Sequence, residues 1–440
     1  MRKSPIIFVI GCTGTGKSDL GVAIAKKYGG EVISVDSMQF YRGLDIATNK
    51  ITEDEAEGIP HHMMSFLNPS DPSAYNVHQF REATLDLIQK IRSRSKIPII
   101  VGGTTYYAES VLYENNLIET TSSTNSDDVI TKSRTSSESS SVASESDDVT
   151  NLALWEELKR VDEHSANLLH PNNRYRVQRA LQIFKETGIP KSQLVQQQKA
   201  DDTVDLGGKL RFDDSLVIYM DATPEVLEER LDGRVDKMIR MGLKKELVEF
   251  YDEHKSQIHQ SKYGVMQCIG LKEFVPWLAM DPPERDTPKG DKLFKKGCDD
   301  VKLHTRQYAR RQRRWYRSRL LIRSDGDRKM ASTKMLDTSD KTKIISDGMA
   351  IVDQWMGGVD LFEDVSVRFQ IRKTTILKLI STENSKNTVM KGQDANVLLR
   401  CELCDISMTG KDNWQRHIDG KKHKHSVKKA KEQQQQQNLG

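Results

Sequence analysis

The sequence predicts an α/β protein with a parallel sheet, followed by mainly helical segments and a small module near its C-terminus. Three observations support this prediction. Short apolar runs alternate with segments of helical spacing over residues 5–118. A glycine-rich turn directly follows the first apolar run, and cysteine and histidine residues gather after residue 400. Strands that alternate with helices are typical of parallel sheets.

Four apolar runs have the length and β-branched content of buried strands. They are Ile6–Ile10, Val32–Val35, Ile97–Val101 and Leu216–Met220. Helical spacing is found at Asp19–Lys27, Leu152–Glu186, Pro224–Met241 and Ile344–Met356, and over most of residues 243–320. We therefore expect a parallel-sheet core with a mostly helical insertion and a helical C-terminal part.

Charge and cysteine content narrow the class of protein. The formal net charge of +4 is too small to indicate a nucleic-acid partner, although basic residues gather late in the chain. No apolar run reaches the roughly 18 residues of a membrane-spanning helix, so no membrane partner is expected. Five scattered cysteines do not form a disulfide framework and fit a reducing compartment. Because the first strand begins near Pro5, no cleavable leader is expected; the cytoplasm is the expected location, with mitochondria and nucleus left open.

A phosphate-binding loop follows the first strand. Residues 11–18 match the pattern GxxxxGK[ST] between a strand and a helix. Its glycines let the backbone wrap so that N–H groups point at phosphate oxygens, and the helix N-terminus adds positive potential. Lys17 supplies a cation, and Ser18 can ligate Mg²⁺. The expected phosphate-binding residues are Gly11, Thr13, Gly14, Thr15, Gly16, Lys17 and Ser18.

The loop does not identify the phosphate compound. A nucleotide kinase or NTPase needs a carboxylate after a second apolar strand, but Ile99–Val101 runs into glycine. Asp221 follows an apolar run, yet it could equally be an ordinary turn residue. Asp36, at the end of the second predicted strand, is better placed because the C-terminal ends of parallel strands gather at one edge. The structural alternative for Asp36 is a helix cap.

The C-terminal module has the spacing of a Cys₂His₂ zinc finger. The expected ligands of a structural Zn²⁺ are Cys401, Cys404, His417 and His423. The cysteine pair fits a hairpin, and the histidine pair fits a helix that begins near Lys411. Lysines at 421, 422 and 424 suggest contact with an RNA backbone.

A basic segment lies upstream of this finger. Residues 304–319 contain seven arginines and no acidic residue. At helical spacing, Arg306, Arg310, Arg313 and Arg317 form one stripe without compensating charge in the segment. Such a stripe is a natural track for RNA phosphates. A solvated helix face is the alternative.

Composition completes the expected domain organisation. Residues 121–150 are dominated by serine, threonine and acids and cannot bury enough apolar surface to fold. They are interpreted as a disordered insertion, either a passive spacer or a phosphorylated segment. The expected parts are a P-loop core at 1–118, an insertion at 119–164, the continued core with its basic helical region at 165–323, a weakly helical linker at 324–396, the zinc finger at 397–425 and a basic, glutamine-rich tail at 426–440.

Several longer motifs resemble one family. Residues 36–50, Asp-Ser-Met-Gln-Phe-Tyr-Arg-Gly-Leu-Asp-Ile-Ala-Thr-Asn-Lys, resemble the signature of the tRNA dimethylallyltransferases. Further matches in family order begin at Pro60, Gly102, Tyr175, Glu229, Gln267 and Thr305, so the resemblance covers roughly residues 5–320 apart from the serine-rich segment. The finger resembles that of eukaryotic, yeast-like members. The resemblance implies transfer of a dimethylallyl group from dimethylallyl diphosphate to N6 of adenosine 37 in tRNA, next to the anticodon.

The resemblance also implies roles for individual residues. Asp36 would act as a general base, Thr15 would lie near the bridging oxygen of the diphosphate, and Arg234 would contact the pyrophosphate. The residues expected on the tRNA are Asp36, Ser37, Met38, Gln39 and Thr104 around the target adenine and Arg176 and Arg179 near the RNA, to which the stripe adds Arg310, Arg313 and Arg317. A monomer that acts on the anticodon stem-loop is expected. A P-loop kinase with an RNA-binding tail and a non-catalytic RNA-binding protein are the alternatives.

Overall fold

The chain divides into two compact units. A computed structural model describes residues 2–71, 75–114, 117–118, 150–201, 209–261, 264–316 and 331–361, and near the C-terminus residues 398–401, 404, 406–409, 411–420 and 423–425. The core unit comprises Met1–Glu138 and Gln198–Phe369, and the second unit comprises Ser139–Gln197 and Gln370–Gly440. The serine-rich insertion up to residue 149, Arg317 and the lysines at 421 and 422 lie outside the described residues.

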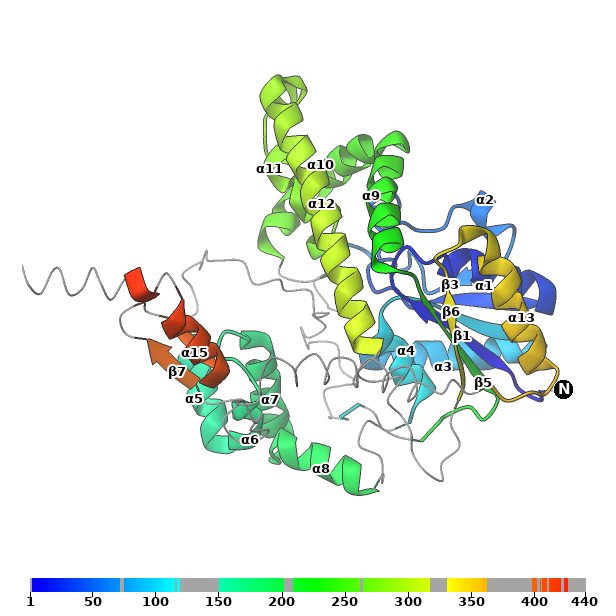
Figure 1. Cartoon of the computed structure of the whole chain (residues 1–440), viewed down its shortest axis with the longest axis horizontal. Coiled ribbons are helices and arrows are strands. Elements are labelled where there is room, and N and C mark those ends of the chain that lie inside the picture. The colour runs from blue at the N-terminus through cyan, green and yellow to red at the C-terminus, as the bar shows by residue number, and fades with distance from the viewer. Residues whose placement is uncertain are drawn as a thin grey trace, which may run out of the picture. The chain divides into compact units, whose positions relative to one another are not determined.

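The core unit is built on a six-stranded parallel sheet (Figure 1). Its strands are β1 (Ile6–Gly11), β2 (Gly30–Ser34), β3 (His61–His62), β4 (Ile97–Gly102), β5 (Ser215–Asp221) and β6 (Ser332–Asp337), in the order β3-β2-β4-β1-β5-β6. Phe8 of the central strand β1 pairs with Ile100 of β4 and Val217 of β5. The four strands predicted from apolar runs are confirmed. Because all strands are parallel, the loops after β1, β2 and β4 leave the same edge.

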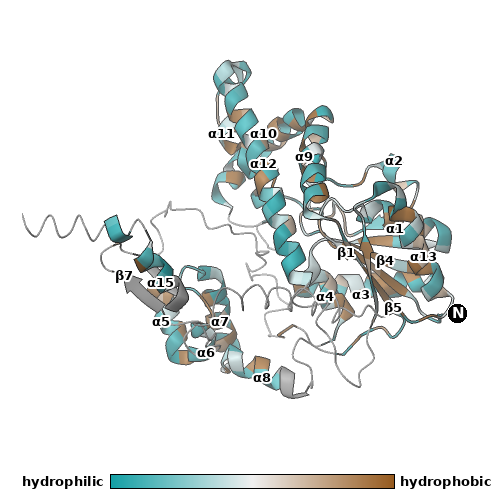
Figure 2. Cartoon of the chain, viewed as in Figure 1, coloured by the Kyte–Doolittle hydropathy of each residue, from teal (hydrophilic) through white to brown (hydrophobic). Residues whose placement is uncertain are grey.

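Helices cover both faces of this sheet. On one face, α1 (Lys17–Tyr28) and α13 (Ile344–Met356) share a core that includes Leu20 and Trp355. On the other face, α3 (Val77–Ser93) and α4 (Thr105–Leu112) contribute Phe80 and Tyr107. Figure 2 shows the apolar strands between helices that carry polar residues. A strand buried on both faces has no polar side to alternate with, which explains why these strands are continuous apolar runs.

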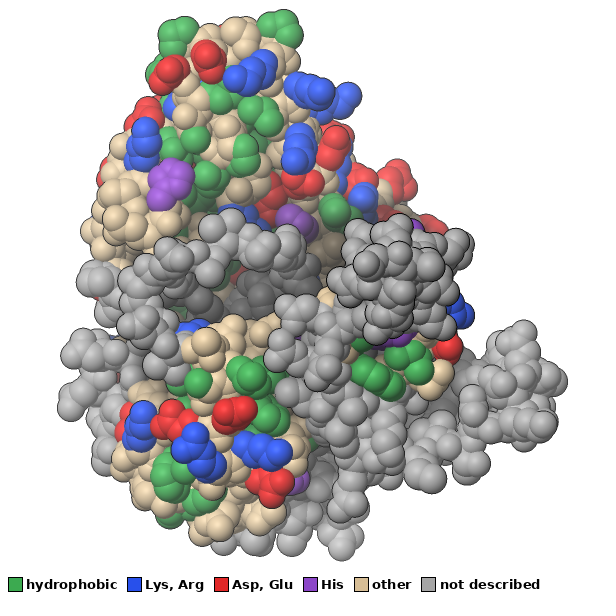
Figure 3. Space-filling view, turned by 90° about the vertical axis from the view of Figure 1, so that its left-hand side faces the viewer, with side chains coloured by type: hydrophobic (Ala, Val, Ile, Leu, Met, Phe, Trp, Pro, Cys, Tyr) green, Lys and Arg blue, Asp and Glu red, His purple; other side chains and the backbone are tan. Residues whose placement is uncertain are grey.

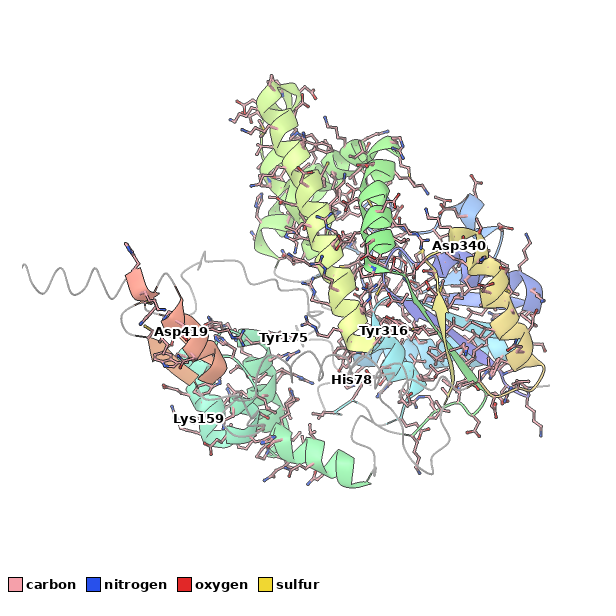
Figure 4. All side chains as sticks on the ribbon, in the orientation of Figure 1. His78, Lys159, Tyr175, Tyr316, Asp340 and Asp419 are labelled. Atoms are coloured by element: carbon pink, nitrogen blue, oxygen red, sulfur yellow. The ribbon has the colours of Figure 1, made fainter. Side chains whose placement is uncertain are left out.

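A group of helices projects from the sheet (Figure 1). It contains α9 (Pro224–Arg240), α10 (Leu243–Gln260), α11 (Val275–Leu278) and α12 (Pro288–Trp315), with 3₁₀ turns at Gly264–Gln267, Lys272–Phe274 and Pro282–Asp286. The predicted helical character of residues 243–320 is confirmed as far as residue 316. The long helix α12 returns to the sheet, where Tyr316 at its end lies with its ring centroid 4.4 Å from that of Tyr219 (Figure 4). No helix in the described residues is both long and apolar enough to cross a bilayer.

The second unit contains its own small helical core. Its helices are α5 (Asn151–Val161), α6 (Glu163–Asn167), α7 (Arg174–Thr187) and α8 (Lys191–Asp201), the last of which ends in the core unit's sequence range. Trp155 is buried there and donates its indole N–H to the carbonyls of Ala166 and Leu169, both at 2.9 Å. The finger consists of β7 (Leu398–Cys401), β8 (Ile406–Thr409) and α15 (Lys411–Asp419). This hairpin and helix confirm the predicted finger elements.

The ends of the inserted segment are joined at the core unit. Tyr113 and Leu210 form an antiparallel bridge. The N–H of Glu114 donates to the carbonyl of Lys209 at 2.8 Å, and the N–H of Arg211 donates to the carbonyl of Leu112 at 2.9 Å. The chain therefore leaves the core after α4 and re-enters it beside the point of exit.

Two expected boundaries need correction. The linker expected at 324–396 contains β6, which extends the sheet by pairing with β5, and only the helix at Ile344–Met356 was predicted there correctly. The strand was missed because Ser-Thr-Lys-Met-Leu-Asp is mostly polar and occupies a sheet edge, where burial is incomplete. Residues 165–197, expected to continue the core, belong to the second unit. There they pack around Val177 and Leu181 with α5.

The first prediction concerns the C-terminal part of the core. Trp355 is 0% exposed and anchors α13 against α1, where Leu20 leaves room only for Gly348. Trp355→Ala should destabilise the core unit by about 3–5 kcal/mol, the usual cost of truncating a buried aromatic side chain. The measurement is the urea midpoint followed by circular dichroism, with Gln354→Ala, an exposed neighbour, as control. Equal midpoints for the two variants would show that α13 is not part of the cooperative core.

Candidate active site

The candidate site lies at the C-terminal edge of the parallel sheet. The phosphate loop follows β1, Asp36 follows β2, and Gly103 and Thr104 follow β4. Because β2, β4 and β1 are adjacent in the sheet, their following loops are neighbours. Side chains of α9 and α12 reach the phosphate loop at this edge from 221 and 299 residues later in the chain.

The phosphate loop has the backbone conformation expected from its glycines. Gly14 and Gly16 have φ values of 84° and 83°, in the left-handed region that favours glycine. A Cβ atom on Gly14 would also lie 2.9 Å from Leu231 of α9. Thr15 is fully buried and donates its hydroxyl to the carbonyl of Cys12 at 2.8 Å. Cys12 packs against Leu227 and Leu231 as a small hydrophobic residue.

Two cations contact the loop. The Lys17 ammonium donates to the Cys12 carbonyl at 2.7 Å, and burial lowers the pKa of Lys17 to about 8. The Arg234 guanidinium of α9 donates to the hydroxyl of Thr13 at 2.8 Å. Burial also lowers the pKa of Arg234, while Asp36 opposes this shift. Two partly buried cations beside backbone N–H groups form a site suited to a polyanion.

Asp36 lies close to these cations. Burial raises the pKa of its carboxyl group, and the Met38 N–H, Lys17 and Arg234 act in the opposite direction. Its Oδ1 accepts the Met38 N–H at 3.1 Å within a turn, and no helix begins there, so the helix-cap alternative is wrong. The Ser37 N–H donates to the Thr104 hydroxyl at 3.4 Å. Asp36, Ser37, Met38 and Thr104 are therefore brought together next to the phosphate loop.

The side chain of Gln39 is engaged within its own loop. It accepts from the Ser34 hydroxyl at 3.0 Å and donates to the carbonyls of Thr48 and Asn49 at 3.2 and 3.0 Å. In this structure Gln39 therefore holds the 36–50 loop together, and its predicted contact with the target base stays a prediction.

Sequence reasoning missed two residues that support the same loop. The Lys50 ammonium is buried and donates to the carbonyls of Tyr41 and Gly43 and to the side chains of Asp45 and Ser65, at 2.6–3.0 Å. Glu246 of α10 accepts the N–H groups of Ile46 and Ala47 at 2.7 and 2.9 Å. The only signal in the sequence was the place of Lys50 at the end of the 36–50 motif.

The arginine stripe on α12 needs correction. Arg306 pairs with Asp232 and Arg310 with Glu228, both at 2.6 Å, and both acids lie on α9. Arg313 pairs with Asp221 at 2.7 Å and also donates to the Ala222 carbonyl. The premise of an uncompensated stripe is therefore wrong for these three arginines, because their partners lie 74 to 92 residues upstream. Acidic and basic side chains are interspersed on the face of the molecule shown in Figure 3.

These ion pairs differ in solvent exposure and therefore in how firmly they hold their two partners together. The Arg310 side chain is 66% exposed, so water competes with its acidic partner. The Arg313 side chain is only 14% exposed and fixes the end of α12 to the end of β5. Asp221, considered above as the carboxylate that a kinase or NTPase would need, is thus an anchor for this helix. Arg176 and Arg179 lie on α7 in the second unit, half-buried.

The finger brings its four predicted ligands together. The ligand atoms of Cys401, Cys404, His417 and His423 lie within 4.8 Å of one another. The His423 Nδ1 is 3.5 Å from the Cys401 sulfur and 3.4 Å from the Cys404 sulfur. Tetrahedral Zn²⁺ with ordinary Zn–S and Zn–N distances separates sulfur and nitrogen by about 3.6 Å. Two thiols and two imidazoles at this spacing fit a structural zinc ion.

Comparisons with known proteins agree with this geometry. The chain matches the family models described as IPP transferase at residues 39–319, isopentenyl transferase at 5–69 and zinc-finger of C2H2 type at 399–423. The tRNA dimethylallyltransferase of Mus musculus is 34% identical, covering 98% of this chain and 87% of the mouse protein. That of Schizosaccharomyces pombe is 33% identical, covering 98% of this chain and 97% of the yeast protein.

A solved structure is similar over the whole chain. A crystal structure of a eukaryotic dimethylallyltransferase acting on tRNA superposes with a TM-score of 0.72 at 29% identity, and the match covers 99% of this chain and 100% of that one. The sequence matches and the structural match span the sheet, the helices and the finger. The chain therefore belongs to the tRNA dimethylallyltransferase family.

Proposed function

We propose that this protein transfers the dimethylallyl group of dimethylallyl diphosphate to N6 of adenosine 37 in tRNA, next to the anticodon. One observation carries the proposal. Asp36, Lys17 and Arg234 come from three separate segments, yet both cations lie close enough to act on the pKa of the Asp36 carboxyl group. A base and a pyrophosphate-binding site side by side suit a substitution in which a proton is lost and pyrophosphate leaves.

The phosphate loop stabilises the leaving group. Negative charge accumulates on the pyrophosphate as the bond between C1 of the prenyl group and oxygen breaks. Lys17, Arg234, Thr15 and the loop N–H groups would receive that charge in a partly buried setting, where electrostatic interactions are stronger than in water. Gly11, Thr13, Gly14, Gly16 and Ser18 complete the proposed pyrophosphate site. Ser18 would hold Mg²⁺, which suits a site of one hydroxyl plus phosphate oxygens and water.

Asp36 accepts the proton that the adenine N6 amine loses. An exocyclic amine is a weak nucleophile because its lone pair is delocalised into the adenine ring. As this lone pair forms the bond to C1, the N6 proton passes to the Asp36 carboxylate, and the electrons of the broken bond leave with pyrophosphate. Ser37, Met38, Gln39 and Thr104 would surround the base. An unpaired anticodon-loop adenine can be turned into such a pocket at low cost.

The tRNA contacts lie outside the catalytic residues. We propose that Arg310, Arg317, Arg176 and Arg179 meet RNA phosphates, while Arg313 contributes by fixing the helix that carries Arg310. An exposed arginine can exchange a carboxylate partner for a phosphate at little cost. The finger would add further interactions with the RNA backbone. The enzyme would act as a monomer. We expect it in the cytoplasm or another reducing compartment, such as mitochondria or the nucleus, because its five scattered cysteines do not form a disulfide framework.

The second prediction tests the base. Asp36→Asn should lower the rate of transfer about 10²-fold or more while fold and tRNA binding persist, because an amide cannot accept the N6 proton. The assay is incubation with dimethylallyl diphosphate and tRNA, followed by nucleoside mass analysis. Asp54→Asn, an exposed site with the same charge change, is the control. Turnover near the wild-type rate in Asp36→Asn would exclude the assignment.

The third prediction concerns pH. The kcat/KM for dimethylallyl diphosphate reports ionisations in the free enzyme, so it should fall above about pH 8 as Lys17 loses its proton. In kcat the same limb should move to higher pH, because bound pyrophosphate favours the charged lysine. On the acid side activity should decline through the raised pKa of Asp36, since only the carboxylate is a base. A kcat/KM that stays flat beyond pH 9 would contradict the role of Lys17.

The fourth prediction concerns the finger. Truncation after about residue 390 should raise the apparent KM for tRNA and leave the rate at saturating tRNA nearly unchanged. For each cation–phosphate pair that truncation removes, the log–log slope of binding against salt should become shallower by about 0.7–0.9. Cys404→Ser should act like truncation, because a structural finger generally unfolds without its metal.

The control for this prediction is His425→Gln, which changes an exposed histidine outside the ligand set. The measurements are tRNA binding and single-turnover kinetics at two or more salt concentrations. If the truncated enzyme binds tRNA with the same affinity and salt slope, the finger serves another purpose. If only the saturated rate falls, the finger helps to assemble the active site.

A further inference from the structure

Gln312 joins two of the loops that form the active site. It lies on α12, is 5% exposed, and accepts the Thr13 N–H of the phosphate loop at 2.9 Å. Its amide nitrogen donates to the Gly103 carbonyl at 3.0 Å. Thr13 follows β1 and Gly103 follows β4, and these strands are neighbours. One side-chain amide therefore bridges the loops after two adjacent strands.

The approach is so close that any residue other than glycine at position 103 would displace the Gln312 amide. A Cβ atom there would lie 2.3 Å from the Gln312 amide nitrogen. An amide offers a donor and an acceptor at a fixed separation, and Gln312 uses both on backbone groups. Thr13 is held a second time through its hydroxyl, which accepts from Arg234. Side chains of both α12 and α9 thus hydrogen-bond to Thr13 near the start of the phosphate loop.

The position of Gln312 is set by neighbours on the same helix. Arg313 is anchored to Asp221, and the Cys12 thiol lies 3.5 Å from the Ala309 carbonyl. The ring of Tyr316 packs against that of Tyr219 in β5, with the two centroids 4.4 Å apart. Since these interactions hold α12 in place without the Gln312 amide, a variant that removes only that amide tests the bridge and not the docking of the helix.

We propose that Gln312 is a positioning residue that sets the distance between the pyrophosphate loop and the turn carrying Thr104. This inference rests on the proposed transfer reaction, in which one loop holds the prenyl donor and the other borders the target base. The two reactants must meet in line, and a displacement of about 1 Å can lower a rate about 10²-fold. Gln312 would fix this alignment before either substrate binds.

The test uses the full-length enzyme and a nearly isosteric change. Gln312→Met keeps the packing and removes both hydrogen bonds. It should weaken binding of dimethylallyl diphosphate about tenfold and lower kcat about 10–100-fold, with tRNA affinity within about threefold of wild type. Gln307→Met, on the same helix and without a hydrogen bond to either loop among the described residues, is the control. Wild-type kcat and donor affinity in Gln312→Met, or equal reductions in both variants, would overturn the proposal.

A second variant gives a signature that a packing defect does not. A protonated carboxylic acid can accept from Thr13 and donate to Gly103 as the amide does, whereas a carboxylate repels the Gly103 carbonyl. The activity of Gln312→Glu relative to wild type should therefore recover as pH falls through the pKa of the introduced group, which burial raises. If the activity of Gln312→Glu relative to wild type does not change with pH, the proposal is overturned. This measurement is also the deciding test if Gln312→Met does not fold. Absence of transfer by the wild-type enzyme would instead refute the proposed function, and calorimetric binding of dimethylallyl diphosphate would still test Gln312.

Discussion

The docking of α12 across the end of the sheet is the interaction on which the rest of the active site depends. A parallel sheet brings the loops after β1, β2 and β4 to one edge, but it does not set the spacing between them. The buried ion pair of Arg313 with Asp221 ties the helix to β5. One residue earlier, Gln312 reaches the loops after β1 and β4. The helix thus fixes the spacing between loops that the sheet only brings to the same edge.

The same helix carries charge of two kinds. A buried pair such as Arg313–Asp221 is costly to break, since removal of either partner leaves an unpaired charge in a poorly solvated place. An exposed pair such as Arg310–Glu228 contributes little to stability and is readily exchanged. Net charge along the segment does not distinguish these cases, because the acidic partners belong to β5 and α9. Solvent exposure is the property that distinguishes an arginine that anchors the helix from one that is available to bind an anionic polymer.

The sequence predicted those features that depend on local pattern. Strands buried on both faces had to be apolar, and the phosphate loop, Asp36 and the four finger ligands follow from short motifs. The edge strand β6 was not predicted because its sequence, Ser332–Asp337, is largely polar. Lys50, Glu246 and Gln312 were not predicted for another reason, because the role of each depends on the backbone groups to which it hydrogen-bonds. For Glu246 and Gln312 these backbone groups lie about 200 or more residues away in the sequence. Long-range pairing of this kind leaves no trace in one sequence.

The bridge between Tyr113 and Leu210 has a consequence for how this protein can change. Closing a loop costs free energy that grows only slowly with its length, and here the two ends are already fastened together at the core. The serine-rich part of the insertion can therefore lengthen or shorten while the two attachment points on the core stay the same. Serine-rich sequence can accumulate at such a place without selection against it. The core can therefore keep its geometry while the length and sequence of the serine-rich segment vary during evolution.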